Sequence, residues 1–140
     1  MTDKIDSSGK KVLKKTIFFV EDEKTLVELV SEFLRSKGYR IEAAYNGNQA
    51  IQMLPVVRPD LILLDLVMPE MSGIDFLKKI QIENSEFASV PVLVLSNLHG
   101  DEENLGKMGL KIKGYFIKAN LRLEELADRI VIALDSGKNK

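Results

Sequence analysis

The stretch Leu61–Gly73, LILLDLVMPEMSG, decides the fold of this 140-residue chain. Four aliphatic residues run directly into Asp65, and Met68, Pro69 and Gly73 follow within eight positions. A short, continuous apolar run is typical of a parallel strand that is covered on both faces. Proline and glycine then indicate a turn. The sequence therefore predicts a buried strand that presents one carboxylate at its end.

Four other short β-rich segments complete a regular series. The expected strands are Thr16–Val20, Arg40–Ala44, Leu61–Leu64, Val92–Leu95 and Tyr115–Ile117. Segments with helical spacing of apolar residues lie between them. Five strand–helix repeats predict an α/β fold, namely a flavodoxin-like, doubly wound sheet of five parallel strands in the order 2-1-3-4-5, with five helices.

The expected helices have recognisable first and last residues. Gly38 follows the apolar stripe of the first helix, as expected at a helix C-terminus. Asn46 with Gln49 resembles a capping box that opens a short helix, which Pro55 is expected to end. Ser72 can cap the next helix.

Length and charge limit the possible functions. The chain suits one domain, expected over residues 15–136, between a flexible N-terminal segment 1–14 and a flexible tail 137–140. The 20 basic and 21 acidic residues leave a net charge of −1, which argues against direct nucleic-acid or membrane binding. The chain has no cysteine, no signal peptide and no apolar run near the roughly 20 residues of a membrane span, so we expect a cytoplasmic protein.

Chemically capable side chains follow the expected strands at their carboxyl ends. Glu21 and Asp22 follow the first strand, Asp65 the third, Ser96 the fourth and Lys118 the fifth. In an open parallel sheet these ends line one crevice. Two carboxylates about 5 Å apart repel by roughly 3 kcal/mol at an effective dielectric near 20, unless a cation or a shifted pKa relieves the repulsion.

The types of these side chains indicate phosphoryl transfer. Oxygen ligands without histidine or cysteine suit Mg²⁺, which prefers to share its site with phosphate. The ammonium of Lys118 and the hydroxyl of Ser96 can bind phosphoryl oxygens. A carboxylate nucleophile, a metal site and a cation together predict transfer to Asp65.

With these residues in this order, the chain resembles a response-regulator receiver domain of bacterial two-component signalling, of the single-domain, chemotaxis type. The resemblance runs from about Lys15 to Ser136. It rests on VEDE at 20–23, DLVMPEMSG at 65–73, VLVLSN at 92–97 and GYFIK at 114–118. The intervals from Asp22 to Asp65, to Ser96 and to Lys118 are 43, 31 and 22 residues, as expected in that family.

The resemblance implies a role for each site residue. Asp65 would accept the phosphoryl group and, with Asp22, bind Mg²⁺ directly. The backbone carbonyl of Val67 would be a third protein ligand, and Glu21 would hold the metal through water.

The remaining residues would respond to the phosphoryl group. Lys118 would pair with it, Ser96 would move onto it, and Tyr115 would turn inward as the aromatic switch.

The resemblance also implies the partners. The donor would be a phosphohistidine on a sensor histidine kinase or a histidine phosphotransfer protein. The face formed by the fourth helix, the strand Tyr115–Ile117 and the last helix would act on a separate protein, or the phosphate would move on in a relay. The chain would then be a stand-alone signalling domain rather than an enzyme, either a monomer or a phosphorylation-dependent dimer.

The sequence departs from the family in several places. Ala119 follows Lys118 where the family usually has proline, often after a cis bond, so we expect a trans peptide or a strained loop. Val67 and Leu98, at positions that often tune hydrolysis, are both apolar, and we expect a long-lived acyl phosphate.

Three other functions fit the sequence less well. A pseudo-receiver that binds partners without phosphate would not need the acidic pair, Asp65 and Lys118. A haloacid-dehalogenase-like phosphohydrolase needs an acid or base two residues after its nucleophile, where this chain has Val67. A nucleotide-binding Rossmann domain needs a glycine-rich first turn, which here reads EDE. The single histidine, His99, is expected to be exposed in a polar loop.

Overall fold

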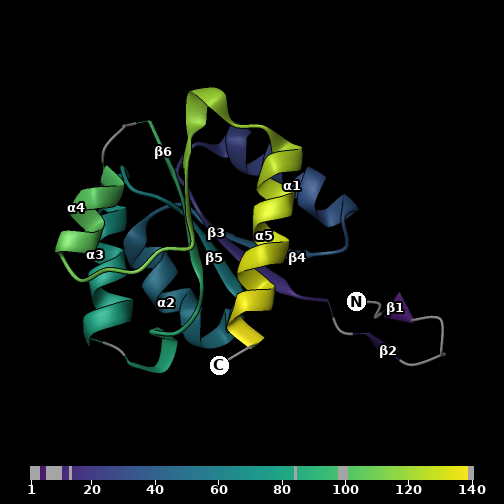
Figure 1. Ribbon diagram of the computed structural model, residues 1–140, viewed down its shortest axis with the longest axis horizontal. Helices are drawn as coiled ribbons and strands as arrows, with labels where there is room; N and C mark the ends of the chain where they lie inside the picture. The colour runs from purple at the N-terminus through teal and green to yellow at the C-terminus, as the bar shows by residue number, and fades with distance from the viewer. Residues whose placement is uncertain (1–3, 6–10, 13, 84, 98–100, 139–140) are drawn as a thin grey trace.

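The structure is a computed structural model that describes residues 4–5, 11–12, 14–83, 85–97 and 101–138. The first two strands, β1 (Lys4–Ile5) and β2 (Lys11–Val12), form a small antiparallel pair. This pair lies to one side of the main sheet (Figure 1). The sequence had not predicted it. The predictions for Leu98 and His99 concern residues outside the described ranges.

The main sheet has five parallel strands. They are β3 (Thr16–Val20), β4 (Arg40–Ala44), β5 (Leu61–Asp65), β6 (Val92–Ser96) and β7 (Gly114–Ile117). Their order across the sheet is β4-β3-β5-β6-β7, which is 2-1-3-4-5 when only these strands are counted. The predicted fold class is therefore confirmed.

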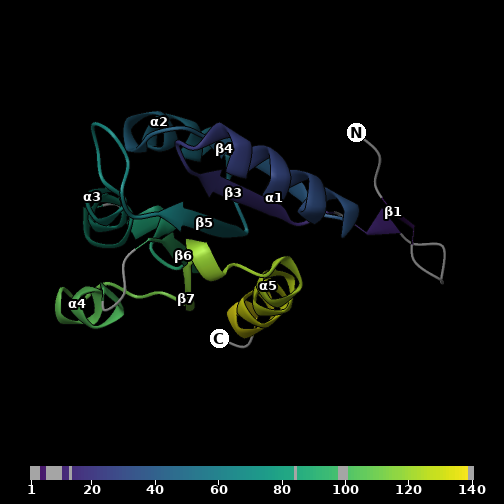
Figure 2. The ribbon, with the colours of Figure 1, turned by 90° about the horizontal axis from the view of Figure 1, so that it is seen from above.

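Helices cover both faces of this sheet. They are α1 (Lys24–Ser36), α2 (Gly47–Val57), α3 (Gly73–Lys78), α4 (Asp101–Lys107) and α5 (Leu123–Lys138). Three shorter helical segments are also present in the described residues. The π-helical segment η1 (Lys79–Glu83) follows α3 and is followed by the 3₁₀ turn η2 (Ser85–Phe87). The 3₁₀ turn η3 (Lys118–Asn120) follows β7. Seen from above, α1 and α5 lie on one side of the sheet, and α2, α3 and α4 lie on the other (Figure 2).

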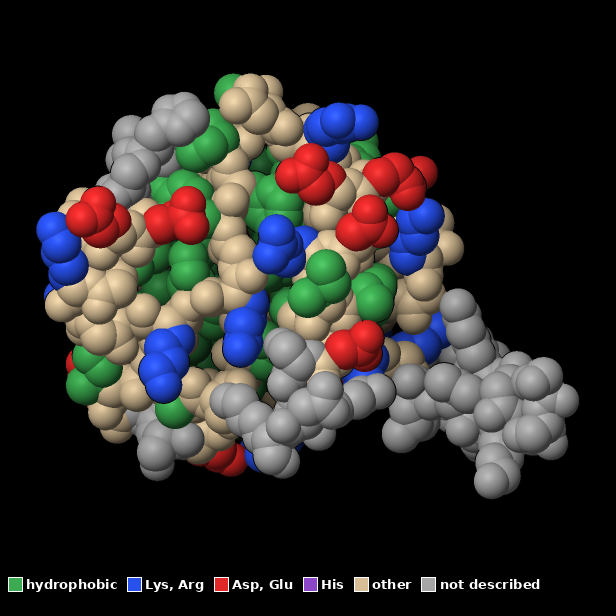
Figure 3. Space-filling view, in the orientation of Figure 1, with side chains coloured by type: hydrophobic (Ala, Val, Ile, Leu, Met, Phe, Trp, Pro, Cys, Tyr) green, Lys and Arg blue, Asp and Glu red, His purple; other side chains and the backbone are tan. Residues whose placement is uncertain are grey.

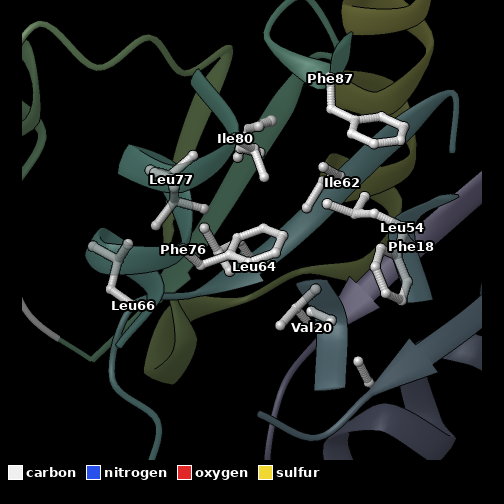
Figure 4. Packing of buried hydrophobic residues seen from close by; sticks show 14 of the residues in the cluster. Phe18, Val20, Leu54, Ile62, Leu64, Leu66, Phe76, Leu77, Ile80 and Phe87 are labelled. Carbon is white, nitrogen blue, oxygen red and sulfur yellow. The ribbon is translucent and has the colours of Figure 1, made fainter. Parts of the chain in front are cut away.

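Alternate residues of the central strands enter two separate hydrophobic cores. Phe18 and Ile62 point towards α2 and α3, where they meet Leu54 and Phe76 (Figure 4). The intervening residues, such as Phe19, point to the other face of the sheet and join the core under α1 and α5. Every residue of β3, β5 and β6 is buried, which explains why these strands lack the polar alternation of a one-sided sheet.

The helix ends agree with the sequence except at Pro55. Asn46 accepts the N–H of Gln49 at 2.8 Å, and Gln49 accepts the N–H of Tyr45 at 2.7 Å. The prediction that Pro55 ends this helix is wrong, because α2 continues through it to Val57. Pro55 lacks an N–H, but the N–H of Arg58 still donates to the carbonyl of Leu54 at 2.9 Å, so the helix closes a further turn around the proline.

Surface charge is mixed in sign. On the face that carries α4 and α5, acidic and basic side chains are interspersed (Figure 3). Among the described helices, none is long and apolar enough to cross a membrane.

Candidate functional site

The carboxyl ends of four neighbouring strands meet at one edge of the sheet. Val20 pairs in register with Leu64, Asp65 with Leu95, and Ser96 with Ile117. The residues that follow these strands therefore face one crevice. The fold brings together Glu21, Asp22, Asp65 and Lys118, which the sequence had assigned to it.

Three carboxylates gather at this edge. Glu21, Asp22 and Asp65 each offer an oxygen, and these oxygens lie within 4.8 Å of one another. Glu21 and Asp65 are buried, with exposed fractions of 0% and 2%, whereas Asp22 is exposed. Such a cluster is costly without a cation, because buried like charges repel strongly. One exposed carboxylate beside two buried ones leaves a side open to water, as Mg²⁺ requires.

Lys118 supplies one positive charge to the two buried carboxylates. Its Nζ lies 2.9 Å from Oε1 of Glu21 and 3.2 Å from Oδ2 of Asp65. The ammonium is itself largely buried, with 11% of the side chain exposed. Oε1 of Glu21 and Oδ2 of Asp65 lie close to the ammonium but lack a well-directed hydrogen bond. These two buried oxygens have acceptor capacity for a cation, so the donor set fits Mg²⁺.

Backbone N–H groups fix the orientation of both buried carboxylates. Val67 donates its N–H to Oδ1 of Asp65 at 3.1 Å, and Glu23 donates to Oε2 of Glu21 at the same distance. Oδ1 of Asp65 is thus used locally, and Oδ2 lies beside Lys118. In Glu21 both oxygens lie beside the ammonium, which also donates a hydrogen bond to Oε2 at 3.1 Å. Val67 is held next to Asp65 by this bond, while the ligand role of its carbonyl stays a prediction.

The turn after Asp65 folds back tightly onto the strand. The N–H of Gly73 donates to the carbonyl of Leu66 at 2.9 Å. A Cβ at Gly73 would lie 2.6 Å from the Cα of Leu66 and would also overlap the carbonyl of Asp65. Only glycine permits this approach, and Ser72 then starts α3 by accepting the N–H of Asp75 at 3.1 Å.

The two predicted switch residues lie on neighbouring strands. Ser96 is the last residue of β6 and is fully buried. Tyr115 on β7 pairs in register with Val94 and packs, half-buried, against the core under α2 and α3. Their switching roles stay predictions. The Lys118–Ala119 peptide, like every other described peptide bond, is trans.

The ion pair between Lys118 and Glu21 was not predicted from the sequence. The resemblance assigned Lys118 to the phosphoryl group and Glu21 to a water-bridged metal contact. The predicted strand order places Glu21 beside Asp65, but it does not specify which of these carboxylates the lysine contacts.

Burial shifts the acid–base behaviour of the site. Burial raises the pKa of Glu21 to about 7, against the opposing hydrogen bond from Lys118 and with a further increase from the charge of Asp65. Burial also raises the pKa of Asp65, opposed by the N–H of Val67 and by Lys118. The pKa of Lys118 rises as well, because the two carboxylates together outweigh the effect of burial.

We expect the metal-free protein to lose stability as the pH rises. Glu21 has a pKa near 7 when folded and 4.5 as its ordinary value, so the folded state holds its proton more tightly. The resulting stabilisation is complete below pH 4.5 and is lost as the pH passes 7, by on the order of 3 kcal/mol. Urea unfolding in a metal chelator from pH 5 to pH 8 measures this loss.

Glu21→Gln should make that pH profile shallower, because the amide does not titrate and only the raised pKa of Asp65 still contributes. The matched control is Glu28→Gln on the exposed side of α1, which should keep the wild-type profile. A wild-type free energy of unfolding that is flat or rises from pH 5 to pH 8 would contradict the prediction.

Comparison with known proteins identifies similar sequences. The family model described as the response regulator receiver domain matches residues 17–131. The transcriptional regulatory protein CrdR of Helicobacter pylori is 36% identical over 118 residues, which cover 84% of this chain and 54% of CrdR. The polar-differentiation response regulator DivK of Brucella anthropi is 30% identical over 99 residues, which cover 69% of this chain and 80% of DivK. The chain spans about half the length of several curated relatives, CrdR included.

Solved structures share the fold of this chain. The chemotaxis protein CheY4 of Vibrio cholerae superposes with a TM-score of 0.76 at 25% identity, covering 86% of this chain and 98% of CheY4. The receiver domain of a signal transduction histidine kinase from Syntrophus aciditrophicus gives a TM-score of 0.78 at 27% identity, covering 90% of this chain and 94% of that domain.

Proposed function

The chain belongs to the response regulator receiver domain family, and we propose that it accepts a phosphoryl group on Asp65 from a phosphohistidine donor. The observation that carries this proposal is the meeting of Asp65 with Glu21, Asp22 and Lys118 at one edge of the sheet. The proposed donor is a sensor histidine kinase or a histidine phosphotransfer protein, and the proposed compartment is the cytoplasm.

The proposed reaction forms an acyl phosphate. An oxygen of Asp65 attacks the phosphorus, the phosphorus–nitrogen bond of the donor breaks, and the imidazole leaves with the electron pair of that bond. Mg²⁺, when bound by Asp22, Asp65 and the carbonyl of Val67, with Glu21 in contact through water, would neutralise charge on the phosphoryl oxygens. Lys118 offers the second positive charge, because its ammonium already lies 3.2 Å from Asp65.

The charge balance of the site favours a change at Lys118 after transfer. In the structure the ammonium is shared between Glu21 and Asp65. Phosphorylation adds oxygens that compete for that ammonium. We propose that Lys118 then pairs with the phosphoryl group, that Ser96 moves onto it, and that Tyr115 turns inward.

We further propose that α4, β7 and α5 transmit this change to a separate partner or to the next protein of a relay. The packing of α4 supports this assignment. The structure describes the α4 side chains from Glu102 to Lys107, and among these only Leu105 is buried. A helix held by one buried side chain can shift at low cost.

Incubation with acetyl phosphate tests the proposed chemistry. We expect the wild-type protein to gain one phosphoryl group by intact-mass measurement when Mg²⁺ is present, and none in a metal chelator. Asp22→Asn should lower the yield at least about tenfold at limiting Mg²⁺, because it removes one directly bound carboxylate.

The matched control for this experiment is Asp75→Asn, an exposed carboxylate at the start of α3. That variant should be labelled like the wild type. Labelling of the wild type that is equal in chelator and in Mg²⁺ would overturn the metal assignment, and no labelling in either would overturn the proposed function.

A further inference from the structure

The strand β4 forms one edge of the five-stranded sheet, and no other strand that the structure describes pairs with its outer side. The N–H of Arg40 donates to the carbonyl of Lys15 at 2.9 Å, and the carbonyl of Ala44 accepts the N–H of Glu21 at 2.9 Å. Alternate residues of a strand direct their backbone groups to opposite sides, so Ile41 and Ala43 direct theirs away from β3. The carbonyl of Ile41 accepts a long 3.4 Å bond from Arg35. An open edge of this kind is a template for another strand.

A groove runs beside this edge on the α2 side. It has a volume of about 400 Å³, and its walls are charged on the strand and, apart from Gln52, apolar on the helix. Arg40 and Glu42 line it from β4, and Met53, Val56 and Val57 line it from α2. Val56 is 86% exposed, the most exposed of the large apolar side chains described. The edge thus offers backbone groups next to an apolar surface in which Val56 is exposed and Met53 and Val57 are partly buried.

The charged side chains of β4 can pair with those of a second, antiparallel β4. Arg40 and Glu42 are two residues apart and both line the groove, so they lie on the same face of β4. If a second β4 lies antiparallel with Ile41 opposite its own copy, each Arg40 faces the Glu42 of the other chain. The register centred on Glu42 would instead place two like charges face to face. Cross-strand pairs of opposite charge stabilise a sheet, and like charges destabilise it.

We propose that the β4 edge binds the β4 edge of a second copy of this chain, antiparallel and centred on Ile41. The two five-stranded sheets then form one continuous sheet, and the two α2 helices lie on the same side of the junction with Val56 between them. A two-fold interface of this type is satisfied by a single self-complementary patch. The proposal is independent of phosphorylation, because the edge does not include the carboxylate site.

The expected dimer is weak. A five-residue strand and part of one helix bury less surface than the standard interface of about 1,600 Å². We therefore expect a dimer that dissociates on dilution. Sedimentation equilibrium of the full chain over a micromolar to millimolar concentration series measures its dissociation constant.

A charge exchange tests the register. Glu42→Arg places two pairs of like charges across the junction and should weaken association at least about tenfold. Arg40→Glu combined with Glu42→Arg restores opposite charges and should recover the wild-type dissociation constant. Val56→Lys, at a position exposed enough to leave the fold intact, should also weaken association. Glu28→Arg, exposed on α1, is the control and should have no effect.

Circular dichroism and thermal unfolding establish that each variant is folded. A wild-type chain that stays monomeric at millimolar concentration overturns the proposal. A dimer that is unaffected by Glu42→Arg and by Val56→Lys also overturns it, and places self-association on another face. A dimer weakened by both changes but not recovered by the charge exchange contradicts the register centred on Ile41.

Discussion

We expect the Asp65→Asn variant to gain no phosphoryl group from acetyl phosphate in the presence of Mg²⁺. The amide cannot replace the carboxylate as nucleophile, and it removes one negative charge from the metal site. Removal of a nucleophile typically costs at least about a thousandfold in rate. Asparagine has nearly the same shape as aspartate, so the N–H of Val67 can still donate to the side-chain oxygen, as it does at 3.1 Å in the wild type.

The same variant separates loss of chemistry from loss of fold. Asp65 is one of two buried carboxylates that share the ammonium of Lys118, and its replacement relieves their repulsion. The metal-free variant should therefore be at least as stable as the wild type at pH 8, by urea unfolding. Labelling of Asp65→Asn at the wild-type level would show that the acceptor is another residue, which peptide mapping would then locate.

The central strands could be predicted because burial on both faces leaves a direct mark on the sequence. Leu61–Leu64 and Val92–Leu95 are apolar at every position, since one set of side chains enters the core under α2 and the other the core under α5. Right-handed crossovers favoured a doubly wound sheet, and the order 2-1-3-4-5 is a common one for such sheets. The end of α2 could not be predicted in this way. Whether a helix continues through Pro55 depends on packing beyond the proline, and propensity alone does not determine it.

The members of the candidate site were predictable, but their pairing was not. Residue type and strand ends assigned Glu21, Asp22, Asp65 and Lys118 to one crevice, and the structure brings them together. The sequence does not specify which carboxylate the flexible lysine contacts. In the structure the ammonium contacts both buried carboxylates, Glu21 and Asp65, because a buried charge without an opposite charge is costly. The exposed Asp22 can rely on water instead.

Gly73→Ala should strongly lower the free energy of unfolding. The new Cβ would lie 2.6 Å from the Cα of Leu66 and would overlap the carbonyl of Asp65. Both are backbone atoms next to the buried strand β5, so they cannot rotate away as a side chain can. We expect a loss of about 2–4 kcal/mol in the free energy of unfolding, even though alanine is the better helix former.

Gly106→Ala is the matched control, because a Cβ at this helical glycine meets no atom within 4 Å. It should leave the free energy of unfolding unchanged or raise it by up to about 1 kcal/mol. Urea unfolding of both variants in Mg²⁺ measures the difference. If Gly73→Ala unfolds at the wild-type urea concentration, the turn must have room for a side chain. Because the overlapped atoms belong to Asp65 and its neighbour, the loss of stability should be accompanied by slower labelling of Asp65 by acetyl phosphate.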